Sequence, residues 1–387
     1  MKLEKGVNQK PLGIYVHVPF CLKKCYYCDF LSVPAKEREI EQYFRALKKE
    51  IFAYRKLAFG YSVRSIFLGG GTPTLPLKKY VVQVLEEIRK VFFVEEGAEI
   101  TIECNPETVD LEKLRIYREA GVNRISFGLQ SVDNRELKEL GRVHTYQRFL
   151  ESFMAAREVG FFNCNVDLMF GLPGQTVDGW ENTVRTVLLL KPEHISAYSL
   201  IVEEGTPFYR KREEGRLFLP DEEEERVMYK KTEQWLKEAG YRRYEISNYA
   251  KAGWECQHNL GYWSGQEYLG LGLGASSYMD GVRFRNLSDF GEYQANVGCL
   301  ERLHKEVQYL TVANQMEEFL FLGLRRMDGI SKKEFERQFG CSVKMVYGEV
   351  VEKWKREGFL EEGEDMIWFT SNGIDVSNVI LADFLLE

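Results

Sequence analysis

Short apolar runs alternate with amphipathic stretches along the first half of the chain. The apolar runs have the length of strands and cover residues 13–18, 65–68, 100–104, 124–128, 163–168 and 194–200. The stretches between them carry apolar residues at helical spacing over residues 37–57, 77–92, 111–120, 146–159 and 177–190. This alternation predicts an α/β fold with a parallel sheet, because each helix returns the chain to the same end of the sheet.

Unusual residues stand at or just after the carboxyl ends of the first five predicted strands. They are the cysteines Cys21, Cys25 and Cys28, the turn Gly70-Gly71-Thr72, and the polar residues Glu103, Gln130 and Asp167. A partly closed barrel and a doubly wound sheet would both explain the alternation. In a barrel, however, all of these positions lie on the rim where such folds hold their active sites. The pattern therefore favours one shared pocket.

The second half of the chain has a different pattern. A helix is predicted over residues 221–239, followed by an irregular stretch rich in glycine and aromatic residues over 240–293. Beyond residue 305 the pattern predicts helices over 319–326 and 346–357, a capping box at Ser331 and Glu334, and one arm of a hairpin over 366–370. We therefore predict three parts: an α/β part over residues 1–220, an α+β extension over 221–304 that contains the run from His258 to Trp263, and a part over 305–387 that resembles a winged helix.

Composition and charge narrow the function classes. The chain of 387 residues is 44% hydrophobic and 29% charged, which is typical of a globular protein with a sizeable core. Its net charge of -7 argues against a broad nucleic-acid surface, which needs clustered lysine and arginine. No apolar run approaches the roughly 20 residues of a membrane span, and the chain starts without an apolar stretch of signal-peptide length. A cytoplasmic location is therefore expected.

Three of the eight cysteines are crowded into one segment with the spacing Cys-x3-Cys-x2-Cys. A structural zinc site usually has four protein ligands, so three thiolates without a fourth ligand fit zinc poorly. Three thiolates can instead hold a 4Fe-4S cluster and leave one iron open to another ligand. A zinc knuckle, a disulfide and three buried thiols are the plainer alternatives. The other five cysteines stand alone, as small buried residues often do, and receive no predicted role.

The cysteine motif, with Tyr27 before its third cysteine, resembles the signature of the radical S-adenosylmethionine (SAM) enzymes. This resemblance implies a partial (β/α)6 barrel, a 4Fe-4S cluster on Cys21, Cys25 and Cys28, and SAM bound to the open iron. It narrows to the branch that contains the oxygen-independent coproporphyrinogen III oxidases and the HemW-like haem chaperones. The resemblance covers nearly the whole chain.

The family resemblance also assigns a set of residues to SAM. They are Tyr15, Tyr27, Gly70, Gly71, Thr72, Glu103, Gln130, Arg142 and Asp167. Glycines allow the close approach of a ligand, and an aromatic face suits adenine. Carboxylates suit the ribose hydroxyls and the cationic sulfonium region, and a guanidinium suits the SAM carboxylate. Without the family, each polar residue in the set would be an ordinary surface or capping residue.

Two departures from the oxidases favour the HemW-like proteins. The oxidases carry a further cysteine two residues after the third, and this chain has Phe30 at that position. The oxidases also have a longer segment before the cysteine motif than the 20 residues that precede Cys21 here. The run from His258 to Trp263 also matches the His-Asn-x-x-Tyr-Trp motif of HemW-like proteins. Imidazole is a good axial ligand for haem iron, which makes His258 a candidate haem ligand. A histidine satisfied by hydrogen bonds in an aromatic corner is the equal alternative.

We therefore expect a haem chaperone that holds a 4Fe-4S cluster, SAM and haem, receives electrons from a donor, and delivers haem to apo-haemoproteins. The first alternative is an oxygen-independent coproporphyrinogen III oxidase, and the second is a regulatory interaction protein acting through the C-terminal domain. The resemblance leaves open whether SAM is cleaved, and hence whether the protein is an enzyme, so no catalytic residue is assigned. A homodimer and a transient membrane contact also stay open.

Overall fold

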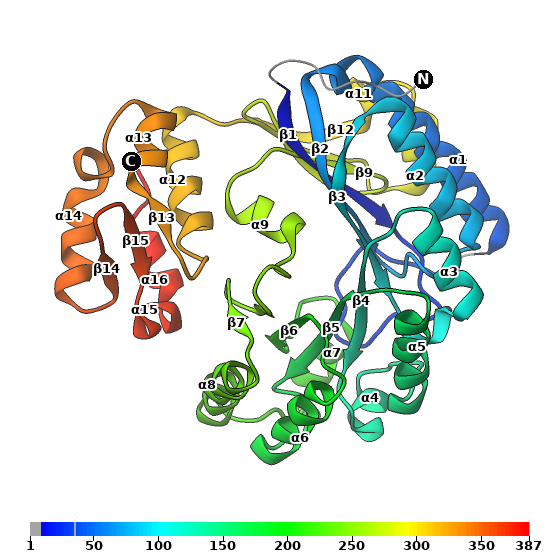
Figure 1. The fold of residues 1–387 in the computed structure, drawn as a ribbon, viewed down its shortest axis with the longest axis horizontal. Helices are drawn as coiled ribbons and strands as arrows, with labels where there is room; N and C mark the ends of the chain where they lie inside the picture. The colour runs from blue at the N-terminus through cyan, green and yellow to red at the C-terminus, as the bar shows by residue number, and fades with distance from the viewer. Residues whose placement is uncertain (1–8, 35, 387) are drawn as a thin grey trace.

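The computed structural model describes residues 9–34 and 36–386 of the chain. The predicted first part begins at residue 1 and the last ends at residue 387, so both predicted ends lie outside the described residues. All six predicted strands are present, five of them within a few residues of their expected bounds, while the third begins at Phe93, seven residues before its predicted start at residue 100 (Figure 1). They are β1 (Lys10–Val18), β2 (Tyr61–Gly70), β3 (Phe93–Cys104), β4 (Arg124–Gln130), β5 (Asn163–Phe170) and β6 (His194–Ser199).

The predicted helices that connect and follow these strands are also confirmed. They are α1 (Glu37–Ala53), α2 (Lys78–Val91), α3 (Leu111–Glu119), α5 (Tyr146–Glu158), α6 (Val177–Leu188) and α8 (Glu222–Glu238). The first of them ends earlier than predicted, because the chain continues as the 3-10 helix η1 (Tyr54–Gly60). The short helices α4 (Asn134–Glu139) and α7 (Pro207–Glu213) were not predicted, since so few residues show no helical periodicity.

The stretch predicted as irregular contains a series of short elements. They are β7 (Arg242–Arg243), β8 (Asn248–Ala250), α9 (Gln257–Trp263), β9 (Tyr268–Leu271), β10 (Ser276–Met279), β11 (Val282–Asn286) and α10 (Phe290–Asn296), with α11 (Leu300–Leu303) and β12 (His304–Tyr309) directly after. Glycines separate several of these strands, and strands this short carry too few residues for a period of two to be visible. The irregular prediction was therefore wrong for this stretch.

Strands β1 to β6 form one parallel sheet in sequence order, and this curved sheet is the predicted partial barrel (Figure 1). The short strands extend it at both edges. Strand β9 pairs in parallel with β1, and β10, β11 and β12 continue in antiparallel pairs. At the opposite edge, β8 pairs with β6 and β7 pairs with β8, both antiparallel. The barrel strands therefore lie in the middle of a much wider sheet.

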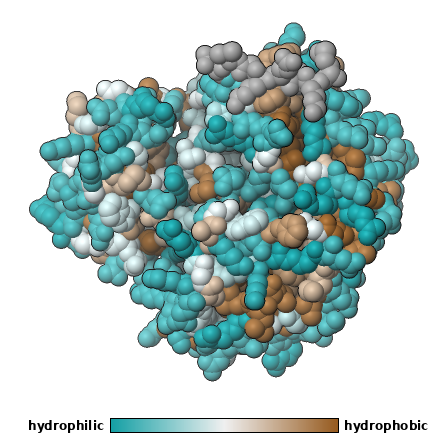
Figure 2. All heavy atoms as spheres, in the orientation of Figure 1, coloured by the Kyte–Doolittle hydropathy of each residue, from teal (hydrophilic) through white to brown (hydrophobic). Residues whose placement is uncertain are grey.

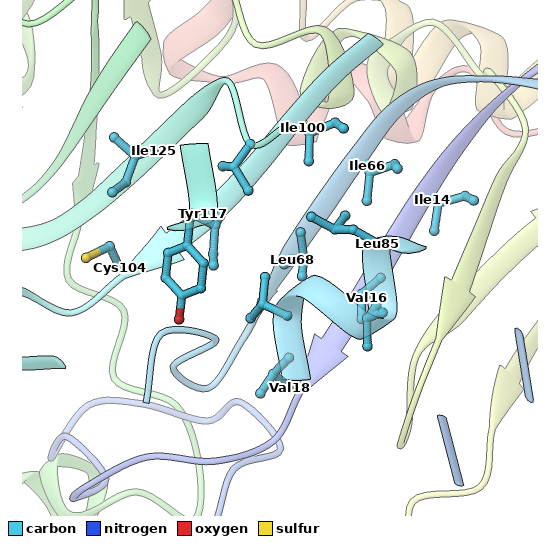
Figure 3. Close-up of a cluster of buried hydrophobic side chains, with 14 of the residues drawn as sticks. Ile14, Val16, Val18, Ile66, Leu68, Leu85, Ile100, Cys104, Tyr117 and Ile125 are labelled. Carbon is cyan, nitrogen blue, oxygen red and sulfur yellow. The ribbon is translucent and has the colours of Figure 1, made fainter. Parts of the chain in front are cut away.

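The outer face of the barrel strands carries the main hydrophobic core. Figure 3 shows this layer, with α2 and α3 packed over the strands through Leu85 and Tyr117. The other labelled side chains of the layer are Ile14, Val16, Val18, Ile66, Leu68, Ile100, Cys104 and Ile125. Successive side chains of a strand point to opposite faces, so the residues between these face the inside of the barrel. The outer face supplies the apolar packing and leaves the inner face available for polar residues.

A buried carboxylate ties the sheet extension to the first helix of the barrel. Glu50 in α1 has no exposed surface. Its carboxylate accepts hydrogen bonds from the Tyr293 hydroxyl at 2.5 Å, Asn286 Nδ2 at 2.7 Å and the Gly272 backbone N–H at 2.9 Å. Burial raises the pKa of Glu50 to about 7, because water no longer stabilises its charged form. Glu50 is thus the polar centre of the junction between α1, β11 and α10.

The C-terminal part forms its own small core, separate from that of the barrel. It contains α12 (Val312–Gly323), β13 (Ile330–Ser331), α13 (Lys332–Phe339), α14 (Val343–Arg356), β14 (Leu360–Glu362), β15 (Met366–Phe369), α15 (Ser371–Asp375) and α16 (Ser377–Ala382). Strands β13, β15 and β14 form an antiparallel sheet against these helices, as in a winged helix. Half of the predicted capping box is present: the Ser331 hydroxyl accepts a hydrogen bond from the Glu334 backbone N–H at 3.1 Å, while the Glu334 carboxylate pairs with Arg337 and not with the Ser331 backbone.

The face of the molecule seen in Figure 2 is mainly hydrophilic, and its apolar side chains gather mostly over the barrel half. Among the described residues, no helix combines the length and the apolar character needed to cross a membrane.

Candidate functional site

A cavity of about 520 Å³ opens among the loops that follow the barrel strands. Most of the residues predicted to bind the cluster and SAM line this one cavity. They are Cys21, Cys25, Tyr27, Cys28, Gly70, Gly71, Thr72, Glu103, Gln130, Arg142 and Asp167. The barrel thus brings together residues that lie far apart in the sequence, as the rim argument predicts. Tyr15 and His258 are the two predicted residues that do not line the cavity.

The cysteine loop runs from β1 towards α1, and its three thiols are free and partly exposed. The Thr72 hydroxyl lies 3.5 Å from Cys21 Sγ, and Arg142 Nη1 donates to Cys25 Sγ at 3.4 Å. Burial raises the pKa of Cys28 to about 11. A bound cation would reverse this effect, because metals bind the thiolate.

These thiols fit an iron–sulfur cluster better than a single metal ion. Within residues 9–34 and 36–386, no three Cys, His, Asp or Glu groups converge closely enough to hold one metal ion. A 4Fe-4S cluster takes each thiolate on a different iron, so its ligands stand further apart than those of one ion. Three soft sulfur donors around one cavity match that requirement and leave the fourth iron open.

The glycine turn after β2 brings the backbone close to the cysteine loop. Gly70 has a φ of +103°, in the region that favours glycine. A Cβ atom on Gly71 would lie 2.7 Å from the Val18 carbonyl oxygen and 2.8 Å from Phe20 backbone atoms. Any side chain at Gly71 would therefore push the strand ends apart and reshape the cavity.

Two partly buried carboxylates face the cavity from β3 and β5, the strands on either side of β4. Glu103 accepts a hydrogen bond from the Gly70 backbone N–H at 3.0 Å, and Asp167 accepts from Asn165 Nδ2 at 2.7 Å and from the Ser126 hydroxyl at 3.1 Å. Burial, with a smaller effect of the Asp167 charge, raises the pKa of Glu103 to about 8. Burial also raises the pKa of Asp167. Among the residues that the structure describes, no cation forms an ion pair with either carboxylate, and the positive charge of the SAM sulfonium would favour their ionised forms.

Gln130 at the end of β4 and Arg142 in the segment between α4 and α5 line the same cavity. Arg142 Nη2 donates to the Gly128 carbonyl at 2.5 Å, while its buried Nε has no hydrogen-bond partner. Gln130 has a φ of +77°, unusual for a residue with a side chain, and its Oε1 accepts a hydrogen bond from the Tyr198 hydroxyl at 2.9 Å. The unpartnered Nε leaves Arg142 with a donor for a ligand such as the SAM carboxylate.

Tyr15 lies behind the cavity wall. Its hydroxyl is 3.0 Å from His17 Nδ1, and its ring stacks on Phe67 at a centroid distance of 6.3 Å. Phe67 lines the cavity, so it stands between Tyr15 and the space that SAM would fill. The structure therefore does not place Tyr15 in the cavity lining, and its predicted contact with SAM stays a prediction.

His258 is buried, with 3% of its surface exposed, and both of its ring nitrogens have partners. Nδ1 lies 2.8 Å from the Ser65 hydroxyl, and Nε2 lies 3.0 Å from the Tyr262 hydroxyl. The ring stacks on Phe67 at 5.2 Å. Burial lowers the pKa of His258 to about 3, so the imidazole is neutral. This is the aromatic-corner arrangement that the sequence offered as the alternative to haem ligation, and the haem role stays a prediction.

The helix that carries His258 closes the inside of the barrel beneath the cavity. The Glu99 carboxylate on β3 accepts hydrogen bonds from the backbone N–H groups of Gln257 at 3.0 Å and His258 at 3.1 Å. It thereby caps the start of α9 and holds this helix against the barrel strands. Asn259, the next residue of α9, lines the cavity.

The sequence prediction missed a group of polar residues that line the cavity from the barrel interior. They are Arg124, Ser126, Asn165, Ser196, Ser247, Asn248 and Asn259. A signal was present in β4, where Arg124, Ser126, Gly128 and Gln130 alternate with apolar residues. Buried parallel strands are normally apolar throughout, so polar residues at every second position indicate a polar barrel interior.

Comparison with known proteins identifies the class of this site. Residues 15–187 match the model of the radical SAM superfamily, and residues 310–376 match that of the HemN C-terminal domain. The fold and the cavity are therefore those of a radical SAM protein, a superfamily that implies a 4Fe-4S cluster and SAM as cofactors.

The curated relatives narrow the class to one family. The heme chaperone HemW of Bacillus subtilis is 38% identical over 96% of this chain and 99% of its own length. The HemW of Escherichia coli is 33% identical over 98% of this chain and 100% of its own. This chain belongs to the HemW family of radical SAM proteins. The solved structure of coproporphyrinogen III oxidase (HemN) from Escherichia coli shares the fold, with a TM-score of 0.85, 24% identity, and coverage of 98% of this chain and 91% of that one.

Proposed function

We propose that the protein is a haem chaperone, which binds a 4Fe-4S cluster, SAM and haem and delivers haem to apo-haemoproteins in the cytoplasm. The observation that carries this proposal is the similarity to the heme chaperone HemW of Bacillus subtilis over 96% of the chain. The cavity supports it, because it gathers the thiols, carboxylates and guanidinium that both cofactors need. A separate electron donor would reduce the cluster.

In this proposal Cys21, Cys25 and Cys28 hold the cluster at the mouth of the cavity. The remaining predicted residues that line the cavity hold SAM: Tyr27, Gly70, Gly71, Thr72, Glu103, Gln130, Arg142 and Asp167. When bound, the cluster supplies an electron and an open iron for SAM. The chain itself orients SAM by opposite charges, with Arg142 facing its carboxylate and the pair Glu103 and Asp167 facing its cationic part.

Haem ligation by His258 would require the buried imidazole to release a partner. Freeing Nε2 means breaking the hydrogen bond with Tyr262, and freeing Nδ1 means breaking that with Ser65. Because His258 stacks on Phe67 in the cavity wall, either change would also alter the wall of the SAM site.

The function is tested with full-length protein whose cluster has been reconstituted without oxygen. We expect haem to bind at micromolar concentration and coproporphyrinogen III to remain unchanged in the presence of SAM and dithionite. Absence of haem binding would remove the proposal. Conversion of coproporphyrinogen III to protoporphyrinogen would indicate the oxidase instead.

Changing His258 to alanine should weaken haem binding at least tenfold, because the iron loses an imidazole ligand. The measurement is a haem titration followed by the Soret absorbance, whose position reports the axial ligand. Tyr262→Phe is the matched variant, since it keeps the aromatic ring and frees Nε2. It should bind haem at least as tightly as the wild type. Unchanged affinity and an unchanged Soret position in His258→Ala would exclude His258 as the ligand.

SAM should bind more tightly as the pH rises through about 8. The pKa of Glu103 is raised to about 8 in the ligand-free protein, and cationic SAM favours the ionised carboxylate. Binding therefore releases a proton from Glu103 below this pH, which weakens the observed affinity there. Calorimetric titrations between about pH 6 and 9 measure the effect.

Glu103→Gln is the control for this titration, because it cannot ionise. Any pH dependence that remains in this variant belongs to other groups, such as Asp167, whose pKa burial also raises, and the α-amino group of SAM. Identical pH profiles for the variant and the wild type would contradict the assignment of Glu103.

A further inference from the structure

Arg124 is a buried cation without a partner. It is the first residue of β4, has 2% of its surface exposed, and lines the cavity. Its Nε has no hydrogen-bond partner, and its guanidinium makes no hydrogen bond or ion pair within the part of the chain that the structure describes. Two partly buried arginines differ from Arg124. Arg243 donates to the Ile246 carbonyl at 2.7 Å, and Arg157 pairs with Glu193 at 2.7 Å.

This arrangement is costly unless something else bonds to the guanidinium. An arginine stays ionised in proteins and carries five N–H donors. Burying such a charge without hydrogen bonds costs several kcal/mol, and native structures rarely leave one in that state. The inside of the barrel therefore calls for an acceptor that the chain itself does not provide.

The nearby carboxylates do not fill this role, because in the described part of the chain their hydrogen bonds go to other groups and neither is bonded to the guanidinium. Glu99 accepts three hydrogen bonds from the start of α9, from Cys256 Sγ and the backbone of Gln257 and His258. Asp167 accepts from Asn165 and Ser126. Both contribute to the field at Arg124, but neither forms an ion pair with it.

Further polar groups stand on the same cavity wall. Ser247, Asn248 and Asn259 line the cavity together with Arg124, and the buried Oδ1 of Asn248 also lacks a partner. Arg124 pairs across the sheet with Thr101, which comes before Glu103 on β3, so Arg124 lies towards the amino-terminal ends of the strands. The cysteine loop follows the carboxyl end of β1, at the other end of the strands. The unpartnered groups therefore lie on the floor of the cavity, away from the cysteines.

We propose that this floor is a second subsite of the cavity, separate from the SAM site, and that Arg124 binds the carboxylate of a ligand there. A guanidinium matches a carboxylate through two parallel hydrogen bonds. A singly charged group is favoured over a phosphate, because Glu99, Glu103 and Asp167 share the barrel interior and would repel a second negative charge. The donor amide of Asn259 and the Ser247 hydroxyl can complete the coordination.

Two sources could bring this carboxylate, a small free acid or the acidic side chain of a porphyrin. The experiment uses full-length, cluster-loaded protein saturated with SAM. The probes are propionate, mesoporphyrin and the dimethyl ester of mesoporphyrin. For the wild type we expect propionate to raise the melting temperature without displacing SAM. If the porphyrin is the source, the free acid should also bind at least tenfold more tightly than its ester.

Arg124→Met tests the residue, and Arg243→Met is the matched control. The affinity of Arg124→Met for the carboxylate probes should fall at least tenfold. This variant should be no less stable than the wild type, since the substitution removes an unpaired buried charge. Arg243→Met should lose stability and keep the response, because Arg243 is hydrogen-bonded and does not line the cavity. A carboxylate response that survives in Arg124→Met, or propionate that competes with SAM, would overturn the second subsite. Wild-type protein that responds to propionate but does not bind haem would overturn the chaperone proposal. It would leave the proposal of a second subsite standing.

Discussion

The Cys25→Ala variant should fold and yet hold almost no iron–sulfur cluster. Three thiolates are the whole protein ligand set in the proposed site, so the loss of one leaves two ligands for a cluster that needs three. We expect the iron content after anaerobic reconstitution to fall from about four atoms per chain to near zero. Iron and sulfide analysis, with electron paramagnetic resonance of the reduced protein, measures the loss.

Cys299→Ala is the matched control for this variant. Cys299 is also a free, partly exposed cysteine, but it lies outside the cavity. It should keep the full cluster and the full signal. Full iron content in Cys25→Ala would show that the cysteine loop is not the cluster site. Stoichiometric zinc in the wild type, with no cluster, would favour the zinc alternative.

Replacing Glu50 by alanine should lower the free energy of unfolding by roughly 3 to 5 kcal/mol, because it removes the shared acceptor of three buried donors, of which only Asn286 keeps other acceptors, the Gly270 and Gly272 carbonyls. These donors are Tyr293, Asn286 and the Gly272 backbone, and they belong to elements packed on α1. Urea unfolding followed by circular dichroism measures the loss. Glu41→Ala changes an exposed glutamate of the same helix and should stay within about 0.5 kcal/mol of the wild type.

The same carboxylate should make stability depend on pH. Burial raises the pKa of Glu50 to about 7 in the folded protein, above its ordinary value of 4.5. Between these values the folded chain holds a proton that the unfolded chain releases, so this contribution to stability falls as the pH rises towards 7 and beyond. Glu50→Gln should be less stable than the wild type at low pH and should lack this slope. A slope equal to that of the wild type would show that other groups cause it.

The barrel could be predicted from the sequence because its strands and helices are long and strongly patterned. The rim residues could also be predicted, since Glu103 and Asp167 stand at the carboxyl ends of parallel strands wherever the exact bounds fall. The edge strands could not, because β9 joins a partner whose pairing residues are more than 250 positions earlier, as Gly13 with Tyr268. Nothing local in four residues reveals such a partner.

The directions of individual side chains were the second feature that the sequence could not predict. His258 and Asn259 are neighbours in one motif, but the phase of α9 against the barrel turns His258 towards Ser65 and places Asn259 on the cavity wall. Glu50 likewise reads as a surface residue of an amphipathic helix, and only the packing of α10 and β11 buries it. Such choices depend on tertiary contacts that a single sequence does not display.

The place of β1 in the sheet has a consequence for how the chain is made. Strand β1 ends up between β2 and β9, and β9 is synthesised about 250 residues after β1. At roughly 5 to 20 residues per second, the β9 side of β1 stays unpaired for about 10 to 50 seconds. Open strand edges recruit other strands, so the nascent chain exposes an aggregation-prone edge during that interval. Ribosome-bound chains that contain β1 but not yet β9 are therefore natural clients for the chaperones that shield such edges during translation.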